Sequence, residues 1–197
     1  IGSEITINPK LFGFQTGPGN TGFCEIGFPV INKESKVIRG PESQLMLRVC
    51  GGRYAAKTYA SLIRDAKYAL YYPSSRGMII SLTKANHRSN IIPKLTGLFR
   101  DWGLRHGTHY DVNKNDYEIT LYNGSTIYLR TSQEPENLPG PDLAWLHPDE
   151  YKSMPESIFT EVLPTVRQYG YPHQVWLSST PGGAAHWSRR IWQPNEY

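Results

Sequence analysis

The chain has 197 residues, of which 39% are apolar and 19% charged, and its formal net charge is +4. This is the composition of a globular domain rather than of a disordered chain, and no apolar run approaches the ~20 residues that a membrane-spanning helix needs. Cys24 and Cys50 are too few for a disulfide framework or a clustered metal site, and no signal-peptide pattern opens the sequence. We therefore expect a protein of a reducing cytoplasm that does not engage a membrane.

The first 40 residues differ from the remainder in their patterning. Residues 1–40 are rich in glycine and lack a regular period, which predicts a loop-rich lead-in packed on the core, with one short strand near 24–30. Residues 41–197 are expected to form the main domain. There, an apolar run over 44–50 ends in two glycines, as is typical of a buried parallel strand. Apolar residues at helical spacing over 58–70 predict a helix next.

Further strands and helices alternate along the chain. A second buried strand is predicted over 78–82, and a helix over 85–102 in which Pro93 allows a kink. Alternating apolar residues on either side of an Asn-Gly pair within 117–130 predict a β-hairpin with a tight type I′ turn. A strand, a helix and a last strand follow over 143–146, 157–168 and 174–179. This alternation predicts an α/β fold, with a mostly parallel sheet flanked by helices and one β-hairpin.

The segment between the first predicted strand and helix fits the phosphate-binding pattern G-x-x-x-x-[G/A]-K-T. In such a loop the backbone N–H groups surround the phosphates, Lys57 neutralises the β- and γ-phosphates, and Thr58 ligates Mg²⁺. Arg53 either reaches the γ-phosphate or is an ordinary surface arginine. Ala56 stands where glycine is usual, and alanine costs roughly 1 kcal/mol or more if the loop needs a positive φ there. The predicted nucleotide-binding residues are Gly51, Gly52, Arg53, Tyr54, Ala55, Ala56, Lys57 and Thr58.

An acidic pair follows the predicted strand over 143–146. Asp149 is a candidate to hold Mg²⁺ through water, and Glu150 is a candidate to orient and deprotonate an attacking water. His147 and Pro148 depart from the apolar approach that is usual for such a pair, because proline removes a hydrogen-bond donor from a strand. At the very end of a strand this loss can be tolerated.

The last predicted strand ends in three hydroxyl side chains, Ser178, Ser179 and Thr180. Ligands of open α/β sheets bind at the carboxyl ends of the strands, so these residues are placed to sense a γ-phosphate. The alternative is that they only cap the end of the strand.

Basic residues concentrate between residues 84 and 106, where Asp101 is the one acidic residue. They form either a solvated helix face or a surface that faces phosphates, and Arg88 and Lys94 are the candidate DNA contacts. The basic residues of this stretch are Lys84, Arg88, Lys94, Arg100 and Arg105.

Taken together, these segments resemble the ATPase domain of phage terminase large subunits, the motors that package double-stranded DNA into procapsids. The resemblance extends over roughly residues 41–190, and the matching stretches are 51–58, 117–130, 135–140, 149–151, 158–167 and 179–181. It implies a RecA-like P-loop fold that hydrolyses ATP with Mg²⁺ in the cytoplasm of the infected host. The implied assembly is a ring, usually of five subunits, with DNA in its channel and with the portal and the small terminase subunit as partners.

The same resemblance assigns roles to individual residues. It implies that Lys57 and Thr58 are the phosphate-binding pair of the loop (Walker A), with Arg53 as a further catalytic candidate. Asp149 is then the metal-side acid and Glu150 the general base (Walker B). The hydroxyl residues Ser178, Ser179 and Thr180 fall at the motif that couples hydrolysis to movement.

The chain also departs from the family pattern. Residues 54–56 replace a segment that usually bears glycine, and Pro139 stands where the family often has an arginine that acts on a neighbour's ATP, a role for which Arg130 is a substitute candidate. Terminases normally continue into a nuclease domain; either that domain is missing from this sequence or cutting resides elsewhere, and nuclease activity is not assigned to these residues. Two alternatives stay open: another DNA-dependent P-loop ATPase, and a nucleotide- or DNA-binding scaffold with weak or lost ATPase activity.

Overall fold

The computed structural model describes residues 44–50, 56–134, 138, 140–180 and 186–187. The chain divides into a unit Ile1–Val30 and a unit Ile31–Tyr197, and every described residue belongs to the second unit. The lead-in over 1–40, the strand expected near 24–30 and residues 51–55 of the loop lie outside the described residues. The expected domain boundary between residues 40 and 41 therefore stays a prediction.

In the described part of the chain, seven strands form one sheet in the order β1-β7-β6-β2-β5-β4-β3. The first five strands in this order run parallel, whereas β4 and β3 add antiparallel pairs at one edge. The mostly parallel sheet that the sequence predicts is confirmed. In chain order the strands are β1 (Gln44–Cys50), β2 (Arg76–Ser81), β3 (Tyr110–Asn113), β4 (Glu118–Leu121), β5 (Thr126–Thr131), β6 (Trp145–Pro148) and β7 (His173–Ser179).

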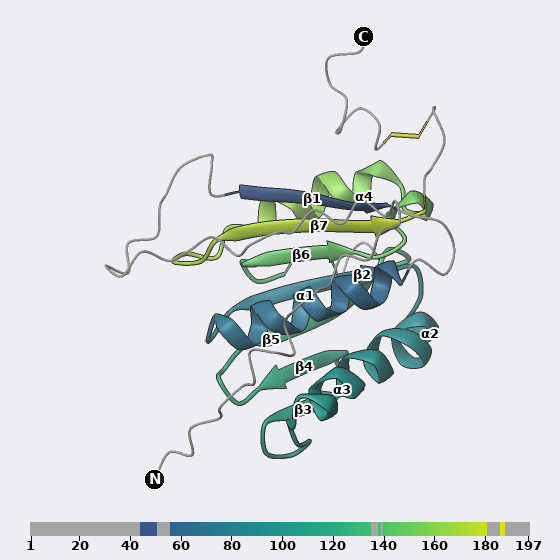
Figure 1. The fold of residues 1–197 in the computed structure, drawn as a ribbon. Helices are drawn as coiled ribbons and strands as arrows, with labels where there is room; N and C mark the ends of the chain where they lie inside the picture. Colours follow the sequence, from purple (N-terminus) through teal and green to yellow (C-terminus); the bar gives the residue numbers. More distant parts are fainter. Residues whose placement is uncertain (1–43, 51–55, 135–137, 139, 181–185, 188–197) are drawn as a thin grey trace, which may run out of the picture. The chain divides into compact units, whose positions relative to one another are not determined.

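Helices cover both faces of this sheet (Figure 1). The long helix α1 packs on one face together with α3, and α4 packs on the other. None of the described helices is long and apolar enough to cross a membrane. The helical segments are α1 (Lys57–Tyr71), α2 (Lys84–Asn86), the π-helix η3 (His87–Ile91), α3 (Ile92–Asp101), the 3₁₀-helix η5 (Tyr151–Ser153), α4 (Glu156–Val162) and the 3₁₀-helix η6 (Leu163–Thr165).

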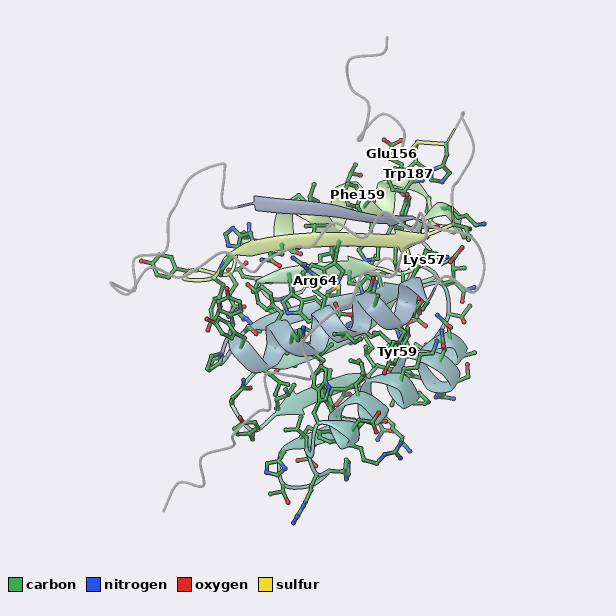
Figure 2. All side chains as sticks on the ribbon, viewed as in Figure 1. Lys57, Tyr59, Arg64, Glu156, Phe159 and Trp187 are labelled. Atoms are coloured by element: carbon green, nitrogen blue, oxygen red, sulfur yellow. The ribbon has the colours of Figure 1, made fainter. Side chains whose placement is uncertain are left out.

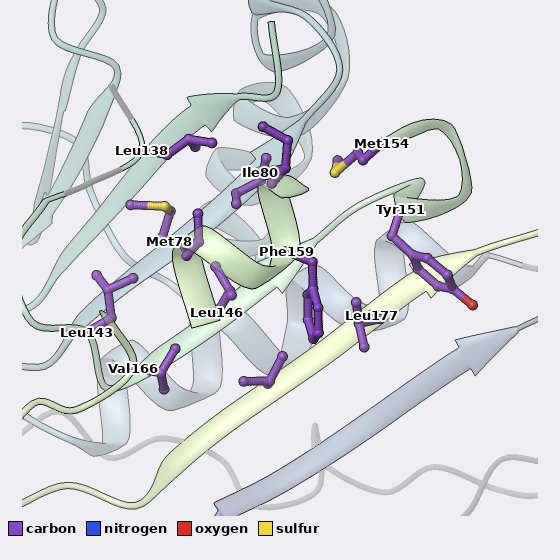
Figure 3. Close-up of a cluster of buried hydrophobic side chains, with 13 residues drawn as sticks. Met78, Ile80, Leu138, Leu143, Leu146, Tyr151, Met154, Phe159, Val166 and Leu177 are labelled. Carbon is purple, nitrogen blue, oxygen red and sulfur yellow. The ribbon is translucent and has the colours of Figure 1, made fainter. Parts of the chain in front are cut away.

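An apolar cluster joins the sheet to α4 (Figure 3). Alternate residues of the strands face this side, because side chains of a strand point to opposite faces in turn. Phe159 of α4 lies 6% exposed in the cluster, and the ring of Trp187 stacks on it with centroids 5.7 Å apart. The strand residues of the cluster are Met78, Ile80, Leu146, Val175 and Leu177.

The opposite face of the sheet is packed with aromatic residues beneath α1. Trp145 of β6 and Trp176 of β7 are neighbours in the sheet, and their rings stack with centroids 5.2 Å apart. Tyr68 of α1 lies against both rings. In Figure 2 Lys57 marks the start of this helix and Arg64 lies further along it, where its guanidinium is 4.9 Å from the centre of the Trp176 ring.

The predicted hairpin is confirmed, but its turn is of a different kind. β4 and β5 pair antiparallel, and the N–H of Gly124 donates to the carbonyl of Leu121 at 2.9 Å. A type I′ turn needs positive φ at both central residues, whereas here Gly124 has a φ of 83° and Asn123 keeps a negative φ. The Asn123 amide instead donates to the carbonyl of Ala69 at 2.8 Å, which ties the turn to the last turn of α1.

The single helix expected over 85–102 is divided into α2, η3 and α3. The N–H of Ile92 donates to the carbonyl of His87, five residues earlier, which makes this turn a π-helix. Pro93 follows directly in the first turn of α3. Because proline lacks an N–H and its ring clashes with the carbonyl four residues before it, the wider turn ahead of Pro93 accommodates it.

Two other local predictions need correction. The helix expected over 157–168 ends at Val162 and continues as the 3₁₀-helix η6, which contains Pro164. β3 was not predicted at all, although Tyr110 and Val112 alternate with polar residues, because four residues are too short a pattern to separate from a loop.

Candidate functional site

The described part of the phosphate-binding loop begins at Ala56, which precedes α1. Its φ of 51° and ψ of 21° place it in the left-handed region, and its carbonyl accepts the N–H of Ala60 at 2.9 Å. Ala56 therefore does have a positive φ, which is unfavourable for a residue that carries a Cβ. Residues 51–55, including Arg53, lie outside the described residues.

We expect Ala56→Gly to raise the free energy of unfolding by about 0.5–1 kcal/mol. Glycine removes the strain of the left-handed backbone, and the greater conformational entropy of glycine in the unfolded chain offsets part of this stabilisation. Ala60→Gly, inside α1, is the matched control and should lower the same quantity by about 0.5–1 kcal/mol. Urea denaturation measures both. Equal destabilisation by the two substitutions would contradict strain at Ala56.

Thr58, in the first turn of α1, lies against the acidic pair. Its hydroxyl donates to Asp149 at 3.0 Å (Oδ1) and 3.3 Å (Oδ2), although the two residues are 91 positions apart. Thr58, the last residue of the predicted phosphate-binding segment, and the predicted acidic pair therefore meet at the same edge of the sheet. Lys57, which precedes Thr58, begins α1 at this edge (Figure 2).

The backbone of Asp149 is fixed by both neighbouring strands. Its N–H donates to the carbonyl of Ile80 on β2 at 2.8 Å, and it forms an isolated parallel bridge with Ser178 on β7. The Ser178 hydroxyl donates to Asp149 Oδ1 at 2.5 Å. The Asp149 side chain is thus held by hydrogen bonds, and the residue is only 4% exposed.

Glu150 is the more exposed member of the acidic pair and has an unusual backbone. Its φ is 57°, in the left-handed region, and its N–H donates to the carbonyl of Ser178 at 2.7 Å. Thr180 donates its hydroxyl to Glu150 Oε1 at 3.1 Å, and the Lys152 ammonium lies 3.7 Å from the same oxygen. The Glu150 side chain is 38% exposed, so it can meet solvent and a ligand.

The three hydroxyl residues at the end of β7 contact the acidic pair and its following turn. Ser178 bonds Asp149 and Thr180 bonds Glu150. Between them, the Ser179 hydroxyl accepts the backbone N–H of Lys152 at 3.3 Å. These hydrogen bonds do more than cap the end of the strand, because each one joins the end of β7 to a residue that follows β6.

Two buried polar side chains beneath α1, His147 and Asp65, form a contact that the sequence does not predict. His147 and Asp65 are both fully buried, and His147 Nδ1 lies 2.7 Å from Asp65 Oδ2. Trp176 donates its indole N–H to Asp65 Oδ1 at 2.7 Å, and His147 Nε2 lies 2.9 Å from the Ser178 hydroxyl. The signal in the sequence was the departure of His147 from an apolar strand.

Burial and mutual contact shift the pKa of both members of this pair. Desolvation raises the pKa of the Asp65 carboxyl above its ordinary value, with His147 acting in the opposite direction. Desolvation lowers the pKa of His147, but the charge and hydrogen bond of Asp65 outweigh it and leave that pKa raised.

The donors at this site suit a hard cation held together with phosphates. Thr58 supplies a hydroxyl oxygen and Asp149 a carboxylate within hydrogen-bond distance of each other. Among the described residues, no group of three or more His, Cys, Asp or Glu side chains gathers into an all-protein metal site. Mg²⁺ in nucleotide sites is held by one or two protein oxygens, waters and the phosphates, so the residues fit that ion.

The other candidate residues in the described part of the chain lie on η3, α3 and β5. Arg88 is exposed on η3, with its guanidinium 5.5 Å from the centre of the Tyr117 ring, and Lys94 is partly exposed on α3. Arg130 is engaged within the hairpin, where it donates to Glu118 at 2.9 Å and to the carbonyl of Asp116 at 3.0 Å. Its guanidinium is thus committed to contacts within this chain. Pro139 lies outside the described residues.

Solved structures of phage packaging proteins share this fold. The Thermus phage P74-26 large terminase ATPase domain superposes with a TM-score of 0.57 at 20% identity, over 74% of this chain and 62% of that one. The large terminase of a thermophilic bacteriophage gives 0.62 at 18% identity, over 78% of this chain and 38% of that one. The N-terminal domain of the DNA packaging ATPase from bacteriophage phi29 gives 0.54 at 13% identity, over 77% and 81%.

The chain therefore spans about three fifths of the P74-26 domain and well under half of the thermophilic bacteriophage terminase. No curated protein matches the sequence. A family profile does match: the one described as phage terminase large subunit covers residues 44–197, more than half of the chain. This match, together with the RecA-like fold, shows that the chain belongs to the family of phage terminase large subunits.

Proposed function

We propose that this domain is an ATP-hydrolysing motor that drives translocation of double-stranded viral DNA into a procapsid. The observation that carries the proposal is the meeting of Thr58, Asp149 and Glu150 at the carboxyl edge of the parallel strands. Family membership favours packaging over another DNA-dependent P-loop ATPase. Structures of the thermophilic bacteriophage terminase in complex with ADP and with ATP-γ-S support nucleotide binding by this fold.

The proposed roles follow from where the side chains lie. Thr58 and Asp149 would hold Mg²⁺, which supplies charge neutralisation to the phosphates when bound. Lys57, at the start of α1, neutralises phosphate charge beside the N-terminal end of the helix dipole. Glu150 orients a water and takes its proton. The hydrogen bond from Thr180 to Glu150 gives β7 a direct connection to the proposed base.

ATP turnover with Mg²⁺ and linear duplex DNA tests this proposal. Lys57→Ala should reduce turnover by about 10²-fold or more, because it removes a charge that stabilises the transition state. Lys67→Ala, ten residues further along the same helix, is the control and should leave turnover within about twofold of the original chain. Equal turnover in all three proteins would overturn the enzymatic proposal.

A scaffold with weak or lost ATPase activity is the second candidate, and Ala56 is the observation that favours it. Its left-handed backbone lies directly before Lys57, so strain is stored at the proposed phosphate site. Nucleotide binding without measurable turnover in the original chain would support this candidate, and turnover that Lys57→Ala abolishes would exclude it.

DNA contact is the proposed role of Arg88 and Lys94. We expect each substitution to glutamine to lower the salt slope of duplex binding by ~1, because each removes one phosphate contact. Arg167→Gln is the control, since the Arg167 guanidinium is paired with Asp142 at 2.7 Å. The slope is obtained from the affinity for duplex DNA measured between about 50 and 200 mM salt. An unchanged slope for Arg88→Gln and Lys94→Gln would show that these side chains face solvent and do not contact DNA.

The assembly around the domain belongs to the same proposal. A ring, with five subunits as the expected number, would surround DNA and engage the portal and the small terminase subunit in the host cytoplasm. Family membership and the packaging-ATPase fold support these partners. An arginine acting across subunits would come from a residue other than Arg130, whose guanidinium is bonded within its own hairpin.

A further inference from the structure

A continuous chain of hydrogen bonds runs from the interior of α1 to the proposed metal-side acid. It begins at Asp65, passes through His147 of β6 and Ser178 of β7, and ends at Asp149. The successive distances are 2.7, 2.9 and 2.5 Å, and none of the four residues is more than 4% exposed. We call these residues the buried chain.

Counting protons fixes the direction of the two bonds that involve Ser178. Ser178 has one hydroxyl proton, and it donates this proton to Asp149 Oδ1. The Ser178 oxygen can then only accept from His147, so the Nε2 atom of the imidazole carries a proton. The opposite ring nitrogen meets Asp65, whose other oxygen already accepts the indole N–H of Trp176. The imidazole is therefore held at both ends.

An Asp–His–Ser series of this kind also occurs in hydrolases that use serine as a nucleophile. That role does not fit here. Ser178 is fully buried inside the sheet, and its proton is already donated to Asp149. No substrate can reach the Ser178 oxygen, so the chemistry of this series is confined to holding Asp149.

Two contacts of α1 converge on the same carboxylate. Thr58 reaches Asp149 directly, and Asp65, seven residues later on the same face of the helix, reaches it through the buried chain. α1 is the helix that follows the proposed phosphate-binding loop. Helix, acidic strand and β7 are thus joined at one side chain.

We propose that Asp65, His147 and Ser178 are positioning residues, which fix the Asp149 carboxylate in the orientation required to hold a divalent cation with a nucleotide. This inference rests on the proposed function, because it takes Asp149 as the metal-side acid. The physical basis is that partners behind a metal ligand set its orientation, and their loss typically lowers metal affinity by about 10- to 100-fold.

The test uses Mn²⁺ in place of Mg²⁺ and a non-hydrolysable ATP analogue, so that affinity is read by electron paramagnetic resonance without turnover. The double variant Asp65→Asn/His147→Phe removes the imidazole and leaves no unpaired charge, while the amide still accepts from Trp176. We expect its Mn²⁺ affinity to fall about 10- to 100-fold. Affinity for the analogue in metal-free buffer should stay within about twofold, which a general loss of structure would not allow.

Asp65→Asn alone is the matched control. Its amide oxygen can accept from Trp176 and its amide N–H can donate to His147 Nδ1, so the Nε2–H of His147 still donates to the Ser178 oxygen. We therefore expect this variant to keep Mn²⁺ affinity within about threefold of the original chain. If the double variant does not fold, Ser178→Ala carries the test, with the same expected loss of Mn²⁺ affinity.

Three results would separate the possible failures. Unchanged Mn²⁺ affinity in the folded double variant, or in Ser178→Ala, would overturn the positioning role. A loss in Asp65→Asn as large as in the double variant would also overturn it, because charge rather than hydrogen bonding would then be decisive. An original chain that binds the Mn²⁺–nucleotide complex without hydrolysing ATP would refute the enzymatic proposal alone, and one that binds no complex would refute both.

Discussion

Replacing Glu150 by glutamine is expected to lower ATP turnover by about 10²- to 10⁴-fold, because the amide cannot accept the proton of the attacking water. The substitution preserves side-chain size, and the amide oxygen can still accept the hydroxyl proton of Thr180. Nucleotide affinity should therefore remain within about threefold. Steady-state turnover with Mg²⁺ and linear duplex DNA, together with fluorescence titration of a labelled nucleotide, measures the two quantities separately.

Glu161→Gln provides the control for this experiment. Glu161 is exposed on α4, and its substitution changes the net charge by the same amount without touching the acidic pair. We expect unchanged turnover in that variant. Turnover by Glu150→Gln at the rate of the original chain would show that another group activates the water, and the geometry around Asp149 would then serve binding alone.

Gly77→Ala is expected to lower the free energy of unfolding by about 3 kcal/mol or more. A Cβ at Gly77 of β2 would lie 1.7 Å from the Trp145 ring, far inside van der Waals contact. The ring has no room to withdraw, because it is fully buried and stacked on Trp176. Overpacking at a strand that pairs with both β5 and β6 should therefore strain the centre of the sheet.

Gly97→Ala is the matched control, since a Cβ there meets no atom within 4 Å. Gly97 lies inside α3, so alanine should stabilise the protein by about 0.5–1 kcal/mol through helix propensity. Urea denaturation followed by tryptophan fluorescence compares the two variants. A cost below ~1 kcal/mol for Gly77→Ala would mean that Trp145 can repack, contrary to the rigidity inferred from its stacking.

The hydrogen bonds at the end of β7 connect both members of the acidic pair to one strand. Ser178 holds the proposed metal-side acid, while Thr180 holds the proposed base two residues later. The positive φ of Glu150 keeps its backbone in a strained conformation that the bond to the Ser178 carbonyl maintains. A change in the contacts of either carboxylate therefore alters the hydrogen bonds at the end of β7.

Local patterns predicted most of the elements. The apolar runs at β1, β2 and β7, the helical spacing in α1 and the hairpin around the Asn-Gly pair follow from neighbouring residues, and each appears in the structure, although the turn of the hairpin is not of type I′. Where the extent or existence of an element was predicted wrongly, a proline or a short pattern was involved. Pro93 moves the helix break into a π-turn ahead of itself, and Pro164 ends α4 early, whereas β3 has only four residues.

The sequence by itself determined the residue types of the candidate site: a lysine and threonine at the start of a helix, an acidic pair after a strand, and three hydroxyls after another. It also determined the family resemblance, because the order of motifs along the chain is a property of the sequence. These are features of local composition, and the physical chemistry of each motif can be argued without coordinates.

Only the tertiary structure decided which of these groups touch. Thr58 meets Asp149 across 91 positions, and Asp65 meets His147 across 82, because the order of β2, β6 and β7 in the sheet places their carboxyl ends beside the start of α1. Strand order results from the packing of the whole domain and leaves no local mark in the sequence. For that reason only the structure shows that His147, which departs from the apolar pattern of its strand, has Asp65 on one side of its ring and Ser178 on the other.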